Sequence, residues 1–330
     1  MSIYQKSGDN LAPVKELKFD LEKDIQRLTE QNLEIVFGLK FVSGALNQEF
    51  CVHVNEQDFY IDTLAWNDDT NSFVIIEYKK TQSFSVIDQG YAYLSAMLNN
   101  KADFVLELNE KLKKNFGKKD IDWEQSRIIF ISPEFTNYQK NAINFKDLPM
   151  YLYEVKVYEN GLVDYNPIQP VQTSASINKI TKDKTVQAVS NQIKVYTPDD
   201  LIRPNWTQTR EIYDELRQQI LSIGSKTNEV TNKQYIAYKL FKNGQWYNFA
   251  EIIPHANGVA IYLDIDKDQL RDSLENTEDC SKIGHWATGK SRFKVTSTEE
   301  VSYSMSLIKQ SYDSKMMDDN ISWHKGSGKI

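Results

Sequence analysis

The chain has 330 residues, of which 40% are hydrophobic and 26% charged, and its formal net charge is −7. At roughly 100–200 residues per domain, this length predicts two domains, each large enough to bury a core. No apolar run approaches the ~20 residues of a membrane span and the N-terminus lacks the pattern of a signal peptide, so we expect a cytoplasmic protein without membrane contact.

The first half of the chain alternates segments of helical and strand-like pattern. In residues 15–37 apolar side chains recur at helical spacing up to Gly38, which predicts an amphipathic helix. Two β-rich runs with the polar turn 67–71 between them predict a hairpin. The predicted segments are, in chain order, a helix at 15–37, strands at 59–66 and 72–79, a helix at 86–98, and strands at 126–132 and 150–158. This order predicts an α/β domain over residues 1–170, with a mixed sheet flanked by helices.

The second half begins with a change of composition. Residues 171–195 are rich in Gln, Thr, Ser, Asn and Lys, which predicts a linker. Residues 196–316 predict a smaller α+β domain, whose last helix follows a capping box of Ser297 and Glu300. Its predicted elements are a helix at 208–223, strands at 233–241 and 258–265, and a helix at 299–312. Residues 317–330 form a polar tail, whose GSGK sequence lacks the spacing of a phosphate-binding loop.

Two acids and a lysine stand at the ends of the predicted hairpin strands. Asp62 lies on the first strand, and Glu77 and Lys79 lie on the second. Side chains alternate along a strand, so Glu77 and Lys79 point to one face while Tyr78 points to the other. The four residues before Glu77 are all apolar, which is typical of a strand in the middle of a sheet. We therefore expect these charged groups to be held together at the margin of the core.

Such a group of residues suits hydrolysis of a phosphodiester bond. The carboxylates of Asp62 and Glu77, with the backbone carbonyl of Tyr78, offer oxygen ligands for Mg²⁺ or Mn²⁺. A bound metal ion lowers the pKa of a water and neutralises charge on the phosphate. The ammonium group of Lys79 would orient that water and stabilise the charged transition state. The two cysteines and four histidines are scattered, which argues against a zinc site or a disulfide framework.

The order Asp62, then Glu77-Tyr78-Lys79, resembles the D…ExK signature of the PD-(D/E)XK nucleases. Gln89 and Tyr93 on the following helix resemble the QxxxY motif of the RecB-like branch, and their spacing of four places them on one helix face. The resemblance implies that these two residues orient the substrate phosphate or the catalytic lysine.

The same resemblance implies one more acidic residue, on the first helix. Glu22 is our choice for this metal ligand, with Glu34 in reserve. The chain over roughly residues 10–315 is also similar to an uncharacterised bacterial family with stretches such as IDTLAW, FVIIEYKK, SVIDQGYAYL and KADFVLE. In that family a second domain of unknown function follows, with the pattern IGHW, here residues 283–286. This similarity implies a fold and a site but names no substrate.

Simpler interpretations compete with each of these assignments. Asp62 could cap a turn, and Glu77 with Lys79 could form an ion pair on an edge strand. Gln89, Tyr93 and Glu22 could be ordinary residues of a helix surface. His285-Trp286 is better explained as a packed turn than as a recognition corner, and the tryptophans as core residues.

The distribution of charge along the chain gives mixed indications about whether the protein binds nucleic acid. Residues 1–170 hold 18 Lys and Arg against 26 Asp and Glu, a balance of −8, whereas residues 171–330 hold 21 against 20. An acidic half argues against contact with phosphates, although a metal-binding carboxylate cluster is itself acidic. The basic run of lysines 111, 113, 114, 118 and 119 fits a phosphate-contacting loop, but a solvated connection is the preferred interpretation.

Taken together, these patterns predict a metal-dependent DNA endonuclease with Mg²⁺ or Mn²⁺ as cofactor. A role in defence against foreign DNA follows only by analogy. The rival hypothesis is a nuclease fold without cleavage activity that binds nucleic acid or a protein. The sequence leaves open DNA against RNA, a homodimer, and a protein partner bound through the C-terminal domain.

Overall fold

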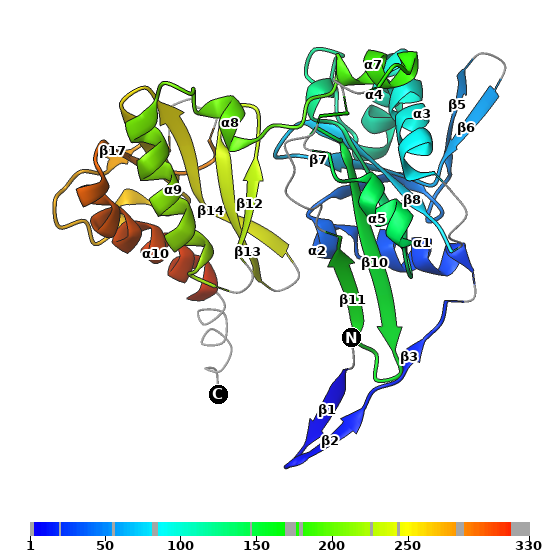
Figure 1. Ribbon diagram of the computed structural model, residues 1–330, viewed down its shortest axis with the longest axis horizontal. Coiled ribbons are helices and arrows are strands. Elements are labelled where there is room, and N and C mark those ends of the chain that lie inside the picture. The colour runs from blue at the N-terminus through cyan, green and yellow to red at the C-terminus, as the bar shows by residue number, and fades with distance from the viewer. Residues whose placement is uncertain are drawn as a thin grey trace, which may run out of the picture. The chain divides into compact units, whose positions relative to one another are not determined.

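The computed structural model describes residues 3–19, 21–54, 57–80, 85–145, 147–168, 176–177, 181–224, 227–242, 245–281 and 287–317. The chain divides into two compact units, Met1–Val195 and Tyr196–Ile330, and each is described by itself (Figure 1). Within the described residues, none of the helices combines the length and the apolar character that crossing a membrane requires.

A seven-stranded mixed sheet forms the centre of the first unit, in the order β11-β10-β9-β8-β7-β4 with β3 also paired to β10. Strands β8, β9 and β10 run parallel, and the other pairs are antiparallel. Its strands are β3 (Glu16–Leu17), β4 (Lys40–Gly44), β7 (Thr63–Asn67), β8 (Ser72–Tyr78), β9 (Arg127–Ser132), β10 (Met150–Tyr158) and β11 (Val163–Pro167). Separate two-stranded ribbons pair β1 (Tyr4–Ser7) with β2 (Asn10–Pro13), and β5 (Phe50–Val54) with β6 (Gln57–Ile61).

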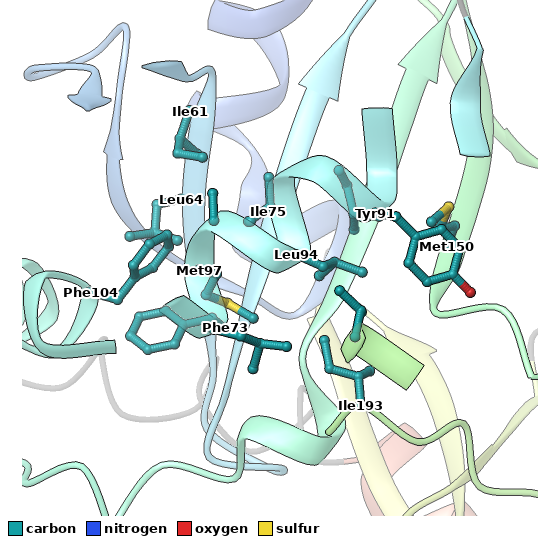
Figure 2. Packing of buried hydrophobic residues seen from close by; sticks show 14 of the residues in the cluster. Ile61, Leu64, Phe73, Ile75, Tyr91, Leu94, Met97, Phe104, Met150 and Ile193 are labelled. Atoms are coloured by element: carbon teal, nitrogen blue, oxygen red, sulfur yellow. The ribbon is translucent and has the colours of Figure 1, made fainter. Parts of the chain in front are cut away.

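Helices cover both faces of this sheet, as predicted for a mixed α/β domain (Figure 1). They are α1 (Glu22–Gln31), α2 (Leu33–Phe37), α3 (Val86–Asn99), α4 (Lys101–Leu112), α5 (Asn137–Ala142) and α7 (Lys184–Ser190). Helices α1 and α2 share one buried cluster with Tyr78 of β8. Helices α3, α4 and α7 share the other with Ile75, and Figure 2 shows Leu94 and Met97 of α3 in this core. Alternate residues of β8 therefore face two different cores.

The helix predicted at 15–37 is correct only from residue 22 onward. Glu16–Leu17 forms the short strand β3, which pairs with the end of β10. Asn32, with φ of −122°, separates α1 from α2, and its side-chain amide donates to the carbonyl oxygen of Leu28 at 2.7 Å. Gly38 ends α2 in the left-handed region at φ 67°, as predicted for a helix stop.

The strand predicted at 59–66 is two strands that pair with different partners. Strand β6 pairs with β5 in the separate ribbon, whereas β7 pairs with β4 and β8 in the sheet. The predicted hairpin of β7 and β8 is confirmed, and Asn71 adopts φ 47° in its turn. Every residue of β8 is buried between β7 and β9, which confirms the prediction of a central strand.

The linker predicted at 171–195 is contradicted over its last 15 residues, 181–195. Residues 181–195 belong to the first unit, where Asp183 caps α7 by accepting from the backbone N–H groups of Thr185 and Val186. Val186 and Val189 of α7 are buried in the core with α3. The polar residues around these few apolar positions hid the helical pattern. Residues 169–175 and 178–180 lie outside the described part of the chain.

The second unit is an antiparallel sheet packed against helices, which agrees with the predicted α+β class. The sheet order is β12-β13-β14-β15-β17-β16. Its elements are α8 (Pro198–Leu201), α9 (Thr207–Leu221), β12 (Thr227–Thr231), β13 (Ile236–Lys242), β14 (Gln245–His255), β15 (Gly258–Leu263), β16 (Glu278–Asp279), β17 (Ser291–Val295) and α10 (Val301–Met317). Ser297 and Glu300 form the predicted capping box. The patterns at 283–286 and 326–329, including His285 and Trp286, lie outside the described residues.

Candidate active site

Asp62 lies where the chain changes its pairing partner, between β6 and β7. The last pair of the β7–β8 ladder is Thr63 with Ile76, so the following residues of β8 pass the end of β7. Asp62 takes the next place, because its Oδ2 accepts a hydrogen bond from the backbone N–H of Tyr78 at 3.1 Å. The backbone N–H of Asp62 in turn donates to Oε1 of Glu77 at 3.4 Å. The prediction that Asp62 lies on a strand is therefore wrong by one residue, but its approach to Glu77 is as expected.

Glu77 and Lys79 share one face of the end of β8. The carboxylate of Glu77 is completely buried, and Nζ of Lys79 lies 3.4 Å from its Oε2. The backbone N–H of Lys79 donates to the carbonyl of Ile131 on β9 at 2.9 Å, which holds the lysine beside the sheet. The alternative of an ion pair is thus half correct, since the pair exists but on a central strand and not on an edge.

The two carboxylates perturb each other. Burial, and then the nearby carboxylate of Asp62, raise the pKa of Glu77 to about 8, although Lys79 acts in the opposite direction. Burial also raises the pKa of Asp62, against hydrogen bonding from Tyr78 and the charge of Lys79. Two ionised carboxylates at this place therefore need more positive charge than Lys79 alone supplies.

Gln89 and Tyr93 lie on helix α3, which packs against the core next to Glu77. Tyr93 hydrogen-bonds to Glu77, and burial together with this carboxylate raises the pKa of the Tyr93 hydroxyl. The side-chain oxygen of Gln89 is buried and has no hydrogen-bond partner among the described residues. Gly90 lets α3 approach closely, because a Cβ there would lie 2.5 Å from Sδ of Met150 on β10. The structure thus brings Tyr93 to Glu77 and leaves Gln89 with an unused acceptor.

Glu22 and Glu34, the acids chosen on the first helices, lie on the surface. Glu22 begins α1, where its Oε1 accepts from the backbone N–H of Lys80 at 2.8 Å and its charge raises the pKa of Asp62. Glu34 is exposed on α2. In the part of the chain that the structure describes, no three Asp, Glu, His or Cys side chains gather closely enough to hold a metal ion.

The donors that are present nevertheless fit a Mg²⁺ or Mn²⁺ ion. They are oxygen atoms, and two carboxylates are the usual protein share for Mg²⁺, which keeps several waters. Glu77 is fully buried and accepts from the backbone N–H of Asp62, so two acidic side chains meet at one place, where a cation would offset their repulsion.

The first helix also contains an acid that the sequence analysis missed. Glu30 is 4% exposed, and its carboxylate accepts from the hydroxyl of Thr63 at 2.6 Å. Gln26, one turn earlier and equally buried, donates to the carbonyl oxygen of Asp62 at 2.6 Å. Their spacing of four, next to the apolar stripe of α1, was the available signal.

The lysine run lies at the opposite end of β7 and β8 from Asp62. Phe116 packs on Trp66 with ring centroids 5.4 Å apart, and the backbone N–H of Asp122 donates to the carbonyl of Asn71 at 2.7 Å. At about 3.3 Å per strand residue, Trp66 lies roughly 13 Å along the chain from Asp62. This location favours the solvated connection over a loop that contacts phosphate at the site.

Comparison with known proteins finds a relative over nearly the whole chain. A family described as a domain of unknown function, DUF5655, matches residues 199–315. An uncharacterized protein of Haemophilus influenzae is 37% identical over 311 residues, which cover 94% of this chain and 99% of that protein. No solved structure matches the chain. The two units therefore occur together in that relative as they do here.

Proposed function

We propose that this chain, which belongs to one family with the Haemophilus influenzae protein, is a metal-dependent nuclease that hydrolyses phosphodiester bonds at Asp62, Glu77 and Lys79. The observation that carries the proposal is a fully buried carboxylate, Glu77, with a second carboxylate and an ammonium group beside it. Buried charges of this kind cost stability unless they are paired or bind a metal ion, and such groups cluster at functional sites.

Each residue of the site then has a specific role in the proposed reaction. Asp62 and Glu77 hold Mg²⁺ or Mn²⁺, with the carbonyl of Tyr78 as a further oxygen donor and with Glu22 nearby, bound to the backbone N–H of Lys80. The ion supplies positive charge beside the phosphate and a water of lowered pKa. Lys79, fixed by its contacts to Glu77 and to β9, orients the attacking water and stabilises charge on the phosphate.

Helix α3 positions the substrate in this proposal. The buried, unpartnered oxygen of Gln89 accepts a hydrogen bond from a water or from substrate, which would satisfy a group that is costly to leave unpaired. Tyr93 keeps its proton because of burial and the charge of Glu77, so its hydroxyl donates to that carboxylate and holds it in place. The hydrogen bond to Glu77 makes the functional interpretation of Tyr93 preferable to a plain surface residue.

The PD-(D/E)XK assignment is part of the proposal. It is supported by the order of the elements, in which an antiparallel hairpin carrying Asp62 and Glu77 is followed by a parallel strand through α3 and α4. We further propose DNA as the substrate and an endonuclease activity, with defence against foreign DNA as an analogy only. The second unit would supply specificity or a protein partner.

Cleavage of supercoiled plasmid with Mn²⁺ or Mg²⁺, against EDTA, tests the proposal. Wild type should nick or linearise the plasmid, and Lys79→Ala should lower the rate by at least ~100-fold. Lys156→Ala is the matched control, because Lys156 on β10 is a similarly half-buried lysine, paired with Glu16 of β3 at 3.1 Å. It should cleave like wild type. Metal binding without cleavage of DNA or RNA would instead favour a non-catalytic binding module. The net negative charge of the first half of the chain is consistent with that alternative.

A further inference from the structure

The buried carboxylate of Glu30 ties three segments of the first unit together. Its Oε1 accepts from the hydroxyl of Thr63 at 2.6 Å and from the side-chain amide of Gln26 at 2.9 Å. The backbone N–H of Ala45 donates to Oε1 at 3.0 Å, and that of Leu46 donates to Oε2 at 2.9 Å. Helix α1, the turn after β4 and the start of β7 therefore meet at one side chain.

Glu30 fixes the backbone that directly follows the Asp62 side chain, through Thr63 and Gln26. Thr63 follows Asp62 directly, and its hydroxyl is bound by Glu30 and lies 3.2 Å from the hydroxyl of Tyr78. Gln26, which Glu30 holds, donates to the carbonyl oxygen of Asp62 at 2.6 Å. The place where the chain passes from β6 into β7 is thus fixed by contacts from α1.

Close packing at the turn after β4 adds to this constraint. A Cβ at Gly44 would lie 2.1 Å from Oε1 of Glu30 and 2.9 Å from the carbonyl oxygen of Asp62. Neither group can retreat easily, since Glu30 is bound by four donors and the Asp62 carbonyl by Gln26. The last residue of β4, Gly44, must therefore be glycine for Glu30 to reach Thr63.

The same contacts argue that Glu30 does not bind the metal ion itself. Four protein donors occupy its two oxygen atoms, and the residue is only 4% exposed. An ionised carboxylate has about four acceptor sites, so four donors leave little capacity for a metal ion, whereas buried partners of this kind orient metal ligands.

We propose that Glu30 is a positioning residue that acts through Thr63 and Gln26 to set the carboxylate of Asp62 opposite Glu77. This inference deepens the proposed function and rests on it, because its effect is on the affinity of the Asp62–Glu77 pair for Mn²⁺. In Glu30→Gln, the side-chain NH2 group would face hydrogen-bond donors that now meet a carboxylate oxygen. Two donors cannot bond to each other, so the contacts that hold the backbone at Asp62 would be weakened.

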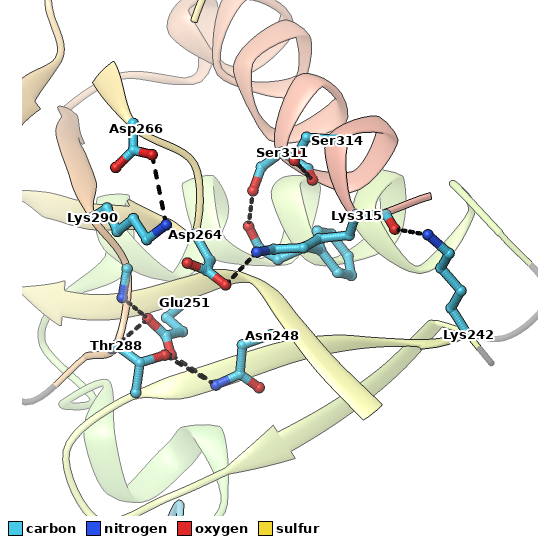
Figure 3. Close-up of polar contacts among 12 residues, drawn as sticks. Lys242, Asn248, Glu251, Asp264, Asp266, Thr288, Lys290, Ser311, Ser314 and Lys315 are labelled. Carbon is cyan, nitrogen blue, oxygen red and sulfur yellow. Dashed lines mark hydrogen bonds and ion pairs between the residues drawn. The ribbon is translucent and has the colours of Figure 1, made fainter. Parts of the chain in front are cut away.

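The test measures Mn²⁺ affinity of the full chain by isothermal titration calorimetry. Glu30→Gln and Thr63→Val should weaken Mn²⁺ binding by roughly 10- to 100-fold, the usual effect of losing an orienting partner. Thr63→Ser keeps the hydroxyl and should restore affinity to within about threefold of wild type. Glu251→Gln is the matched control, because Glu251 is also a buried carboxylate bound by Asn248, Thr288 and Gly289, but in the second unit (Figure 3).

The outcomes separate the possible failures. Wild-type affinity in both Glu30→Gln and Thr63→Val would overturn the positioning role and leave the proposed nuclease intact. Complete loss in Glu30→Gln with no change in Thr63→Val would overturn it in favour of Glu30 as a direct ligand. Absence of Mn²⁺ binding and of cleavage in wild type would overturn the proposed function and this inference with it. If Glu30→Gln does not fold, as circular dichroism would reveal, the pair Thr63→Val and Thr63→Ser decides.

Discussion

Replacing Glu77 with glutamine should remove a pH-dependent loss of stability from the metal-free protein. Burial and the carboxylate of Asp62 raise the pKa of Glu77 from 4.5 to about 8. Between these two values the folded protein keeps a proton that the unfolded chain has released. The stability contributed by protonated Glu77 is therefore complete below pH 4.5 and is lost as the pH rises through about 8.

The size of the effect follows from the width of this window. Each pH unit changes the free energy of unfolding by at most about 1.4 kcal/mol, so the whole window is worth roughly 3–5 kcal/mol. Glutamine carries no proton that titrates here, so Glu77→Gln should lack this slope. The substitution itself can change the free energy of unfolding by an amount that does not depend on pH. On top of that constant, the difference in free energy of unfolding between Glu77→Gln and wild type should shift by several kcal/mol in favour of the variant between about pH 5 and pH 8.5.

The assay measures unfolding of the full chain in EDTA by calorimetry across that pH range. Glu34→Gln, which changes an exposed glutamate, is the control. At pH 8, Mn²⁺ at about 100 times its Kd should stabilise wild type by roughly 2.7 kcal/mol and should stabilise Glu77→Gln less. Parallel pH profiles of wild type and Glu77→Gln would refute the reasoning, because they would mean that Glu77 does not carry the buried, pH-dependent charge.

Three more outcomes are expected. Asp62→Ala should abolish the thermal shift that Mn²⁺ produces in wild type, and an undiminished shift would place the metal elsewhere. Gly90→Ala should displace the side chain of Met150, whose Sδ would lie 2.5 Å from the new Cβ, and should lower plasmid cleavage by disturbing the packing of α3; cleavage equal to that of wild type would contradict this. Val189→Ala should destabilise the first unit by about 1–3 kcal/mol in urea unfolding, since Val189 is fully buried under α3, whereas a change below about 0.5 kcal/mol would restore the linker interpretation.

Short-range pattern was sufficient for much of the candidate site. The apolar run before Glu77 predicted a central strand, and the two-residue period of a strand placed Glu77 and Lys79 on one face, where they form an ion pair. The spacing of Gln89 and Tyr93 placed both on one side of α3, and Tyr93 does contact Glu77. These features depend on backbone geometry within a few residues, which the local sequence encodes directly.

Long-range pairing decided what local pattern missed. The run of residues 59–66 has uniform β character, yet it divides at Asp62 because β6 pairs with β5 and β7 pairs with β8. That choice of partner depends on segments far along the chain. Residues 181–195 likewise resembled a linker by composition, and only burial of Val186 and Val189 against α3 shows them to be part of the first unit.

Local sequence pattern is sufficient to predict the α/β class, the central strand, and the acids and lysine at its end. Which glutamate of α1 and α2 supports the site depended on tertiary packing. Glu22, Glu30 and Glu34 all suit a helical pattern, but the way the two helices pack against the sheet buries Glu30 and leaves the other two exposed. The contact that distinguishes Glu30 joins it to Thr63, 33 residues away. A helical period specifies which residues share a face, whereas the neighbour that the face meets depends on how the whole chain packs.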